Sequence, residues 1–369
     1  MKNSTQMTEN TPQSRIETVL VRCPNWVGDI VMATPTFDCL RKSFAGAKMI
    51  GLIRKRAKEI LRDGPWFDAF IDCEDKSWSG LRRTVRQIRA LKPDIAIVLP
   101  NSIRSALTVR LGGAKRIYGY RRSGRGILLT GGPTPKRQRG KIVPIPMADY
   151  YLEICRRLGL DTPASPKPSL YVGPELQAKA QQLFEKYGLR RQDTVIGLNP
   201  GASFGSSKCW PAEHFAALAE LIEHRLDAKI LLLSGPGEES IVQAIGSQTR
   251  ARIIDTGPDK IDLGLLKPVI RRCDLLITND TGPRHYAVAF DVPVVVIMGP
   301  TDPRYTAASL EKTVVIRKEL DCSPCHKKVC PTDHTCMTDI TPDMVFEQTV
   351  KLLKVNKKDE AIGISKTVD

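Results

Sequence analysis

The chain has 369 residues, of which 41% are hydrophobic and 26% charged, and its formal net charge at pH 7 is +16. This length favours two domains, and this composition is that of a folded globular protein. No apolar run approaches the ~20 residues of a membrane span, and residues 1–15 lack a signal-peptide core. Ten cysteines without such a signal fit a reducing compartment better than a disulfide scaffold.

The positive charge is confined to the N-terminal half. Residues 1–170 carry 31 Lys and Arg against 14 Asp and Glu, whereas residues 171–369 carry 25 against 26. This asymmetry favours an anionic partner such as nucleic acid, an acidic membrane surface or a phosphorylated glycan. Aromatic residues make up only 6% of the chain and no nucleic-acid-binding module is recognisable, so nucleic acid ranks below the other two.

Strands and helices alternate along the N-terminal half. The expected strands are 18–22, 48–53, 69–72 and 94–99. The expected helices are 29–44, 81–91 and one that begins after Ser102. The Gly-, Pro- and cation-rich stretch 123–146 is predicted to be a mobile loop.

The alternation restarts after a Pro-rich junction at residues 162–168. Expected strands follow at 195–198, 229–233, 274–279, 292–298 and 314–316, with helices at 211–224, 238–247 and 262–272 between them. The pattern predicts an α/β protein with two doubly wound Rossmann-like domains, in which ligands bind in a cleft at the carboxyl ends of the strands. The expected divisions are a disordered 1–14, domains at 15–168 and 169–354, and a flexible tail at 355–369.

The segment Asp280-Thr281-Gly282 lies between an apolar strand and a short helix. Free N–H groups and the positive end of the helix dipole favour phosphate there. Thr281 offers a hydroxyl donor, Gly282 lets phosphate approach the backbone, and Asp280 can accept hydrogen bonds from sugar hydroxyls. The alternative is a capped helix without a ligand.

Two loops after strands also suit a nucleotide. The loop 199–211 contains small residues, Ser203 among them, and Lys208, which suit a diphosphate although the Walker pattern is not met. After the next strand, Glu238 or the adjacent Glu239 can bridge a ribose diol, or simply cap the following helix. Asp29, at the end of Asn25-Trp-Val-Gly-Asp29, is either a helix cap or a general base facing the cleft.

Metal-binding chemistry has one possible location in the sequence. Four cysteines and two histidines occur between Cys322 and Cys336, at spacings that match no standard zinc finger. They form either a zinc site or a loop of reduced thiols; the cysteines are Cys322, Cys325, Cys330 and Cys336. No Asp-x-Asp triplet occurs, so a metal-chelating donor site has no obvious carrier.

Three segments in this order resemble glycosyltransferase family 9, the bacterial lipopolysaccharide heptosyltransferases: Asn25–Asp29, Asn199–Pro211 and Asn279–His285. The Asn-Trp-Val-Gly-Asp form and the Cys-Ser-Pro-Cys segment are most similar to the heptosyltransferase II branch. The resemblance implies a GT-B fold and inverting transfer of L-glycero-D-manno-heptose from ADP-heptose to heptose I in the inner core of lipid A-linked lipopolysaccharide. It implies no metal or other cofactor, and a location at the inner face of the cytoplasmic membrane.

The resemblance also assigns roles to residues. It makes Asp29 the general base. The implied donor-binding residues are Ser203, Lys208, Glu238, Asp280, Thr281, Gly282 and His285. The cationic half then faces the anionic acceptor, with Arg54, Lys55, Arg56, Arg121 and Arg122 as acceptor-binding residues. The alternatives are a first heptosyltransferase acting on Kdo, another nucleotide-sugar enzyme, and a non-catalytic protein that binds nucleic acid or a membrane surface.

Overall fold

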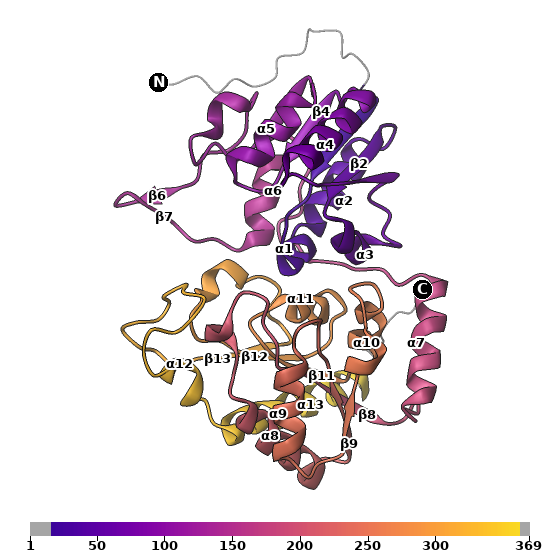
Figure 1. The fold of residues 1–369 in the computed structure, drawn as a ribbon, viewed down its shortest axis with the longest axis vertical. Helices are drawn as coiled ribbons and strands as arrows, with labels where there is room; N and C mark the ends of the chain where they lie inside the picture. The colour runs from indigo at the N-terminus through magenta and orange to yellow at the C-terminus, as the bar shows by residue number, and fades with distance from the viewer. Residues whose placement is uncertain (1–15, 362–369) are drawn as a thin grey trace.

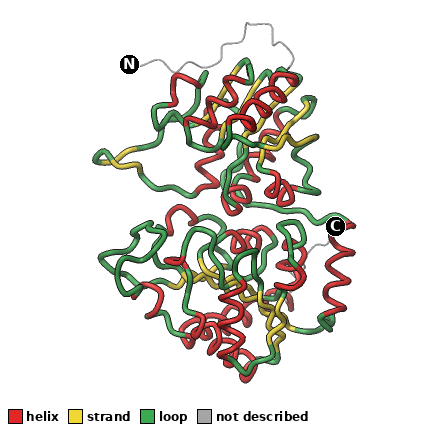
Figure 2. The backbone as a smooth tube through the Cα atoms, viewed as in Figure 1, coloured by secondary structure: helices red, strands yellow, loops and turns green. Residues whose placement is uncertain are grey.

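The computed structural model describes residues 16–361, and of residues 357–361 the backbone only. The chain forms two α/β domains, one above the other in Figure 1. Each domain has a central sheet with helices around it (Figure 2). The expected disordered segment 1–14 lies outside the described residues.

The N-terminal domain contains a five-stranded parallel sheet in the order β3-β2-β1-β4-β5. The central strand β1 places Val19 beside Met49 of β2 and Ile95 of β4. Residues of β1, β2 and β4 are almost all buried, as expected for parallel strands covered on both faces. The strands are β1 Thr18–Arg22, β2 Lys48–Ile53, β3 Ala69–Asp72, β4 Ile95–Val98 and β5 Arg116–Gly119.

Two expectations for the helices and loops of this domain are corrected. The single helix predicted for 29–44 is two helices, because Pro35 has no N–H to continue the hydrogen bonding and the Thr34 hydroxyl donates to Val31 O instead. The predicted loop 123–146 contains a short 3-10 helix and a hairpin. The elements are α1 Val27–Met32, α2 Thr34–Ser43, η1 Lys55–Ala57, α3 Lys58–Leu61, α4 Trp78–Leu91, α5 Ile103–Leu111, η2 Arg125–Leu128, β6 Arg137–Gln138, β7 Lys141–Ile142 and α6 Met147–Arg157. Helices α3 and α6 are additions to the predicted set.

The C-terminal domain contains a six-stranded parallel sheet in the order β10-β9-β8-β11-β12-β13. The order reverses direction between β8 and β11, which makes the carboxyl ends of these two strands the topological switch point. The strands are β8 Thr194–Asn199, β9 Ala228–Leu232, β10 Ile253–Asp255, β11 Leu275–Asn279, β12 Val294–Ile297 and β13 Thr313–Ile316.

One helix prediction for this domain is corrected, and a final helix was not predicted. The helix expected from Asp262 begins at Leu266, because the Asp262 carboxylate accepts from the N–H groups of Gly264 and Leu265 and forms a turn. The final helix continues past Val355, where the tail was expected. The elements are α7 Pro174–Lys186, η3 Ser206–Lys208, α8 Ala212–Arg225, α9 Glu239–Gln248, η4 Gly257–Asp259, α10 Leu266–Arg272, α11 Gly282–Ala289, η5 Pro303–Thr306, α12 Thr335–Thr338 and α13 Pro342–Ala361.

The two domains meet at the carboxyl edges of their sheets. Helix α1 of one domain contacts helix α11 of the other, and both lie at the junction in Figure 1. The buried Lys267 of α10 donates to Arg62 O across the same junction, at 2.5 Å. Within residues 16–361, no helix combines the length and apolarity needed to cross a membrane.

Candidate active site

Asp29 lies in the first turn of α1, at the carboxyl end of the central strand β1. The turn before it is held by buried Arg22, whose guanidinium donates to Asn25 Oδ1 at 2.8 Å. Trp26 occupies the N-cap position, so Asp29 is not the N-cap residue. Burial raises the pKa of Asp29 to about 6, against the opposing effects of a Tyr151 hydrogen bond and the charge of Lys208. A carboxylate with this pKa can take up a proton near neutral pH.

Across the junction, Asp280 joins two cations at the switch point of the second sheet. Lys208 Nζ lies 2.8 Å from Asp280 Oδ2, and Arg284 Nη1 lies 2.7 Å from Oδ1. The Thr301 hydroxyl also donates to Oδ2, at 2.6 Å. Although burial alone would raise the pKa of Asp280, Arg284 and Lys208 hold it well below its usual range. The cluster therefore keeps one negative and two positive charges at neutral pH.

Asn279 positions this cluster by tying two loops together. Its side-chain amide donates to Pro200 O at 2.6 Å, and its oxygen accepts from Trp210 N at 3.1 Å. Both partners lie in the loop that carries Lys208, after β8. The Asn-Asp pair at the end of β11 thus fixes the lysine, with Asn279 holding its loop and Asp280 its ammonium group. Ser203 is exposed in the same loop.

Helices α1 and α11 approach closely because two glycines stand at their starts. A Cβ on Gly28 would lie 2.5 Å from Cδ2 of His285, and a Cβ on Gly282 would lie 2.7 Å from Cγ1 of Val27. His285 is therefore packed against the residue beside Asp29. Burial lowers the pKa of His285 to about 3, so the imidazole is neutral at pH 7.

Glu238 and Glu239 occupy different surroundings. The Glu238 carboxylate accepts from Gly235 N at 2.7 Å and fills the space beside Gly201, where an added Cβ would overlap it. Burial raises the pKa of Glu238. Glu239 is exposed and lines a neighbouring cavity. Glu238 thus lies between the loop that carries Lys208 and this cavity.

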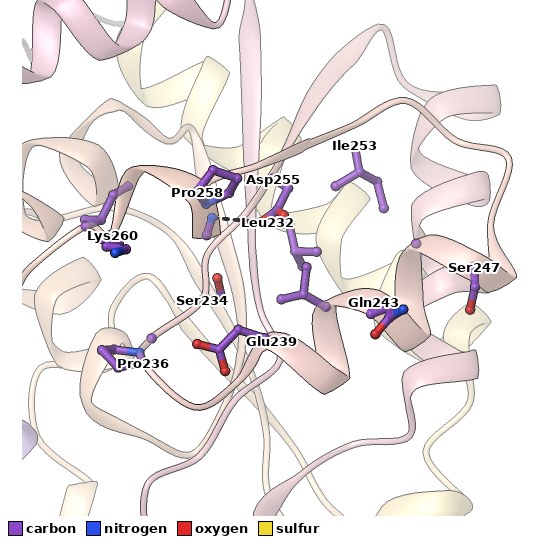
Figure 3. Close-up of a pocket in the computed structure, with 15 residues that line it drawn as sticks. Leu232, Ser234, Pro236, Glu239, Gln243, Ser247, Ile253, Asp255, Pro258 and Lys260 are labelled. Atoms are coloured by element: carbon purple, nitrogen blue, oxygen red, sulfur yellow. Dashed lines mark hydrogen bonds between the residues drawn. The ribbon is translucent and has the colours of Figure 1, made fainter.

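The cavity has a volume of about 820 Å³ and lies at the carboxyl ends of β9 and β10. In Figure 3, Glu239 and Gln243 of α9 lie on one side of it, and Asp255, Pro258 and Lys260 on the other. Apolar side chains complete the wall: Leu232, Val242, Ile253 and Ile261. A mostly apolar pocket with a few polar groups has the character of a site for a small organic ligand.

The predicted acceptor-binding cations flank Asp29 on both sides. Residues 54–56 follow β2 and residues 121–122 follow β5, at the same edge of the sheet as Asp29. Arg122 Nη1 approaches Tyr150 OH at 3.5 Å, and Tyr150 is the neighbour of Tyr151 in α6. The structure therefore brings these cations to the cleft edge, and their role in binding stays a prediction.

The cysteine-rich segment lies in the C-terminal domain, apart from the cavity already described. All four cysteines line a cavity of about 230 Å³ together with His334, whose Nε2 lies 2.8 Å from Ser207 O. Burial raises the pKa of Cys336 to about 11, and its three cysteine neighbours act in the same direction. Among the described residues, no group of three or more His, Cys, Asp or Glu is arranged to hold a metal ion.

Two doubly wound domains that meet at the carboxyl edges of their sheets, with Asp29 of one within electrostatic reach of Lys208 of the other, have the architecture of the GT-B class of glycosyltransferases. A solved family 9 glycosyl transferase from Veillonella parvula matches with a TM-score of 0.79 at 25% identity, covering 92% of this chain and 99% of that one. Escherichia coli ADP-heptose lps heptosyltransferase II matches with a TM-score of 0.74, also at 25% identity over 92% and 99%.

The sequence comparisons give the family. Haemophilus influenzae lipooligosaccharide heptosyltransferase 2 is 30% identical over 91% of this chain and 99% of its own length. Residues 81–336 match glycosyltransferase family 9 (heptosyltransferase), and the chain belongs to that family. The predicted fold, family and enzyme class are confirmed. The matched range contains the donor motifs and begins after Asp29.

Sequence reasoning missed four groups in this region. Arg284 is fully buried beside Asp280, and Thr301 comes from the distant β12–η5 connection. Tyr151 reaches Asp29 from α6, and Asp255 enters the large cavity from β10. Only Arg284 was predictable from the local sequence. It stands four residues after Asp280, and side chains at this spacing at a helix start lie close together.

Proposed function

We propose that this protein transfers L-glycero-D-manno-heptose from ADP-heptose to heptose I of the lipopolysaccharide inner core, with inversion at the anomeric carbon. The relatives of this chain support the donor and the acceptor class, since they include an ADP-heptose lps heptosyltransferase II and a lipooligosaccharide heptosyltransferase 2. The acceptor oxygen attacks the anomeric carbon, its proton passes to a base, and the sugar–phosphate bond breaks with release of ADP.

The observation that carries this proposal is the environment of Asp29. Its pKa of about 6 leaves it ionised at pH 7 but basic enough to accept a proton in the transition state. It lies on the opposite domain from the donor motifs and is within electrostatic reach of Lys208. A base in that place can deprotonate an acceptor hydroxyl while a donor lies against the facing domain.

The C-terminal domain offers a place for each part of the donor: the adenine, the ribose, the diphosphate and the sugar. The large cavity at β9 and β10 suits the adenine base, and Glu238, between that cavity and the Lys208 loop, suits the ribose. The diphosphate then lies by Lys208 and the start of α11, where Thr281 and Gly282 present backbone N–H groups. The sugar is left beside Asp280 and neutral His285, near Asp29.

Stabilisation of the leaving ADP requires no metal in this proposal. Negative charge develops on the diphosphate as the glycosidic bond breaks. Lys208, Arg284 and the dipole of α11 offset this charge, while Asp280 keeps the two cations in place. Fixed positive groups therefore stabilise the leaving diphosphate, as a divalent cation does in metal-dependent sites.

We propose that the acceptor's carboxylates and phosphates bind the cationic rim beside Asp29. Arg54, Lys55 and Arg56 lie on one side of β1, and Arg121 and Arg122 on the other. Charge reversal at residues 54–56 should raise the KM for the acceptor and leave the KM for ADP-heptose near its original value. An equal effect on both substrates would contradict this assignment.

An acceptor series tests the function directly. Purified protein is incubated with ADP-heptose and truncated lipopolysaccharides that carry no heptose, one heptose or two, and the products are weighed by mass spectrometry. We expect one added heptose on the acceptor that carries one. Transfer to the heptose-free acceptor would make this a first heptosyltransferase acting on Kdo. Failure with all three, while another nucleotide sugar reacts, would disprove the donor assignment.

A further inference from the structure

An apolar stripe runs along the outward side of α5, with the exposed Arg104 and Arg110 beside it. Ile103, Leu107 and Leu111 are all exposed, Ile103 to 52%. Their spacing of four residues places them along one stripe. Surface helices normally turn charged residues to solvent and apolar ones to the core. This stripe therefore points to a contact outside the domain.

Two further exposed apolar side chains lie on elements that pack against α5. Trp78, at the start of α4, is 81% exposed, and Ile127 in η2 is 91% exposed. Helix α4 and η2 both pack against α5, and α4 and α5 lie side by side in Figure 1. Arg104 Nη1 donates to Asp75 O at 3.2 Å, which ties the start of α5 to the segment before Trp78. We call this surface the α5 face: Trp78, Ile103, Leu107, Leu111 and Ile127.

The charge around the α5 face is mostly positive, although Glu74, which pairs with Arg83 at 2.7 Å, stands just before Trp78. Between residues 76 and 148 the sequence contains seventeen Lys and Arg and a single acidic residue, Asp94. That carboxylate is paired with Lys115 at 2.8 Å. The hairpin β6–β7 projects from the same domain in Figure 1 and adds four exposed cations. Exposed cations before, within and after α5 include Arg82, Arg86, Arg104, Arg110 and Arg121.

We propose that the α5 face docks the protein onto an anionic phospholipid bilayer. Aliphatic and Trp side chains lower the free energy when they enter the boundary between head groups and acyl chains. The surrounding cations are attracted to anionic head groups. Nucleic acid is the poorer fit, because single strands are bound through aromatic stacking and duplexes through polar contacts. Ile103, Leu107 and Leu111 satisfy neither requirement.

The proposal deepens the proposed function and rests on it for its purpose. Helix α5 begins directly after β4, at the sheet edge that faces the cleft, so docking through α5 holds the cleft beside the bilayer. A lipid-linked acceptor would then reach Asp29 without leaving the membrane. The binding itself does not depend on the identity of the transferred sugar.

Vesicle flotation of the full chain tests the docking. We expect binding to vesicles of phosphatidylethanolamine with phosphatidylglycerol, and far less to phosphatidylcholine alone. Leu107→Asp/Leu111→Asp should reduce the bound fraction about tenfold or more, because it places carboxylates where acyl chains were. Val355→Asp is the matched control, since Val355 is 57% exposed on α13 of the other domain, and should bind like the parent. Unchanged binding of the double variant would overturn the proposal.

Activity separates this proposal from the proposed function. With a lipid-free oligosaccharide acceptor, Leu107→Asp/Leu111→Asp should turn over like the parent; with acceptor embedded in anionic vesicles it should be slower, about in proportion to its lost binding. Vesicle binding by the parent without transfer to any acceptor would disprove the function and leave the docking intact. Binding to single-stranded RNA in preference to vesicles would overturn the docking instead.

Discussion

Asp29 and Asp280 occupy equivalent positions in their two domains, but their pKa values are shifted in opposite directions. Each stands where a central parallel strand gives way to a helix, α1 in one domain and α11 in the other. Burial raises the pKa of Asp29 to about 6, because only a Tyr151 hydrogen bond and a more distant Lys208 oppose it. Asp280 is more deeply buried than Asp29 but pairs directly with Arg284 and Lys208, which hold its pKa well below its usual range.

The difference shows that the partners of a carboxylate, more than its burial, decide its chemistry. Asp280 cannot take up a proton near neutral pH, so it serves as a fixed anion that holds two cations. Asp29 has no directly paired cation among its main influences and remains basic. Two carboxylates whose environments separate their pKa values in this way divide the roles of a site between them.

Replacing Asp29 should have the largest effect on catalysis. Asp29→Asn removes the base, and we expect the turnover number to fall by ~10²–10⁴ while the Kd for ADP changes little. Turnover is measured by ADP release, and Kd by calorimetry. The matched change Asp38→Asn removes another half-buried carboxylate of the same domain, bound to Trp66 Nε1, and should leave turnover near normal. Near-normal turnover of Asp29→Asn would make Asp29 a structural residue.

Replacing Asp280 should reduce stability instead. Asp280→Asn leaves the fully buried Arg284 without its counter-charge, which typically costs roughly 3–5 kcal/mol in the free energy of unfolding. Urea denaturation measures this loss. Asp302→Asn is the control, because Asp302 is also buried but pairs with the exposed Arg304, and it should lose only about 1 kcal/mol. Equal losses for the two variants would contradict the anchoring role of Asp280.

Removing Lys208 should weaken donor binding and, because its charge lowers the pKa of Asp29, should also raise that pKa. A hydrogen bond to a charged group contributes about 1.5–3 kcal/mol, so Lys208→Ala should raise the Kd for ADP roughly 10–100-fold. Lys179→Ala, which breaks an exposed ion pair on α7, is the control and should leave the Kd unchanged. Normal ADP binding with lost activity would move Lys208 from donor binding to the chemical step.

The strands and the cleft motifs were predictable because their signals are local. Buried parallel strands read as continuous apolar runs, and β1, β2 and β3 match their predicted bounds. Strand β5 was missed because Arg-Ile-Tyr-Gly at residues 116–119 is short and half polar. Ser77 caps α4 and adds a first turn that the apolar spacing did not include.

The side-chain pairs of the site were not predictable, because they join segments far apart in sequence. Tyr151 meets Asp29 only because α6 returns to pack beside α1, and no helix was predicted at α6. Thr301 meets Asp280 through the order of neighbouring strands. Motif order thus identified the loops of the site, while the pKa values that give Asp29 and Asp280 different roles come from tertiary contacts.

Loss of the Tyr151 hydroxyl should shift the acid limb of the pH profile of kcat/KM to higher pH. The hydroxyl bonds to the ionised form of Asp29 and lowers its pKa, so Tyr151→Phe should raise that pKa. The acid limb of kcat/KM, expected near pH 6 in the parent, should then shift upward by about one unit. Tyr286→Phe, which loses a hydroxyl bound to Leu263 O, is the control. A lower turnover at every pH without a shifted limb would show that Tyr151 acts only in packing.

Metal chelation should have the smallest effect on the rate, because the proposed roles of Asp29 and Asp280 require no metal ion. Asp280 is saturated by Lys208, Arg284 and Thr301, so a divalent cation would have to displace two fixed cations to bind there. We therefore expect EDTA to leave the rate of ADP release unchanged. The same assay on Cys322→Ser/Cys325→Ser isolates the cysteine-rich segment from the cleft. A loss that Mg²⁺ or Mn²⁺ restores in both proteins would place a metal in the cleft and contradict the assigned roles of Lys208 and Arg284.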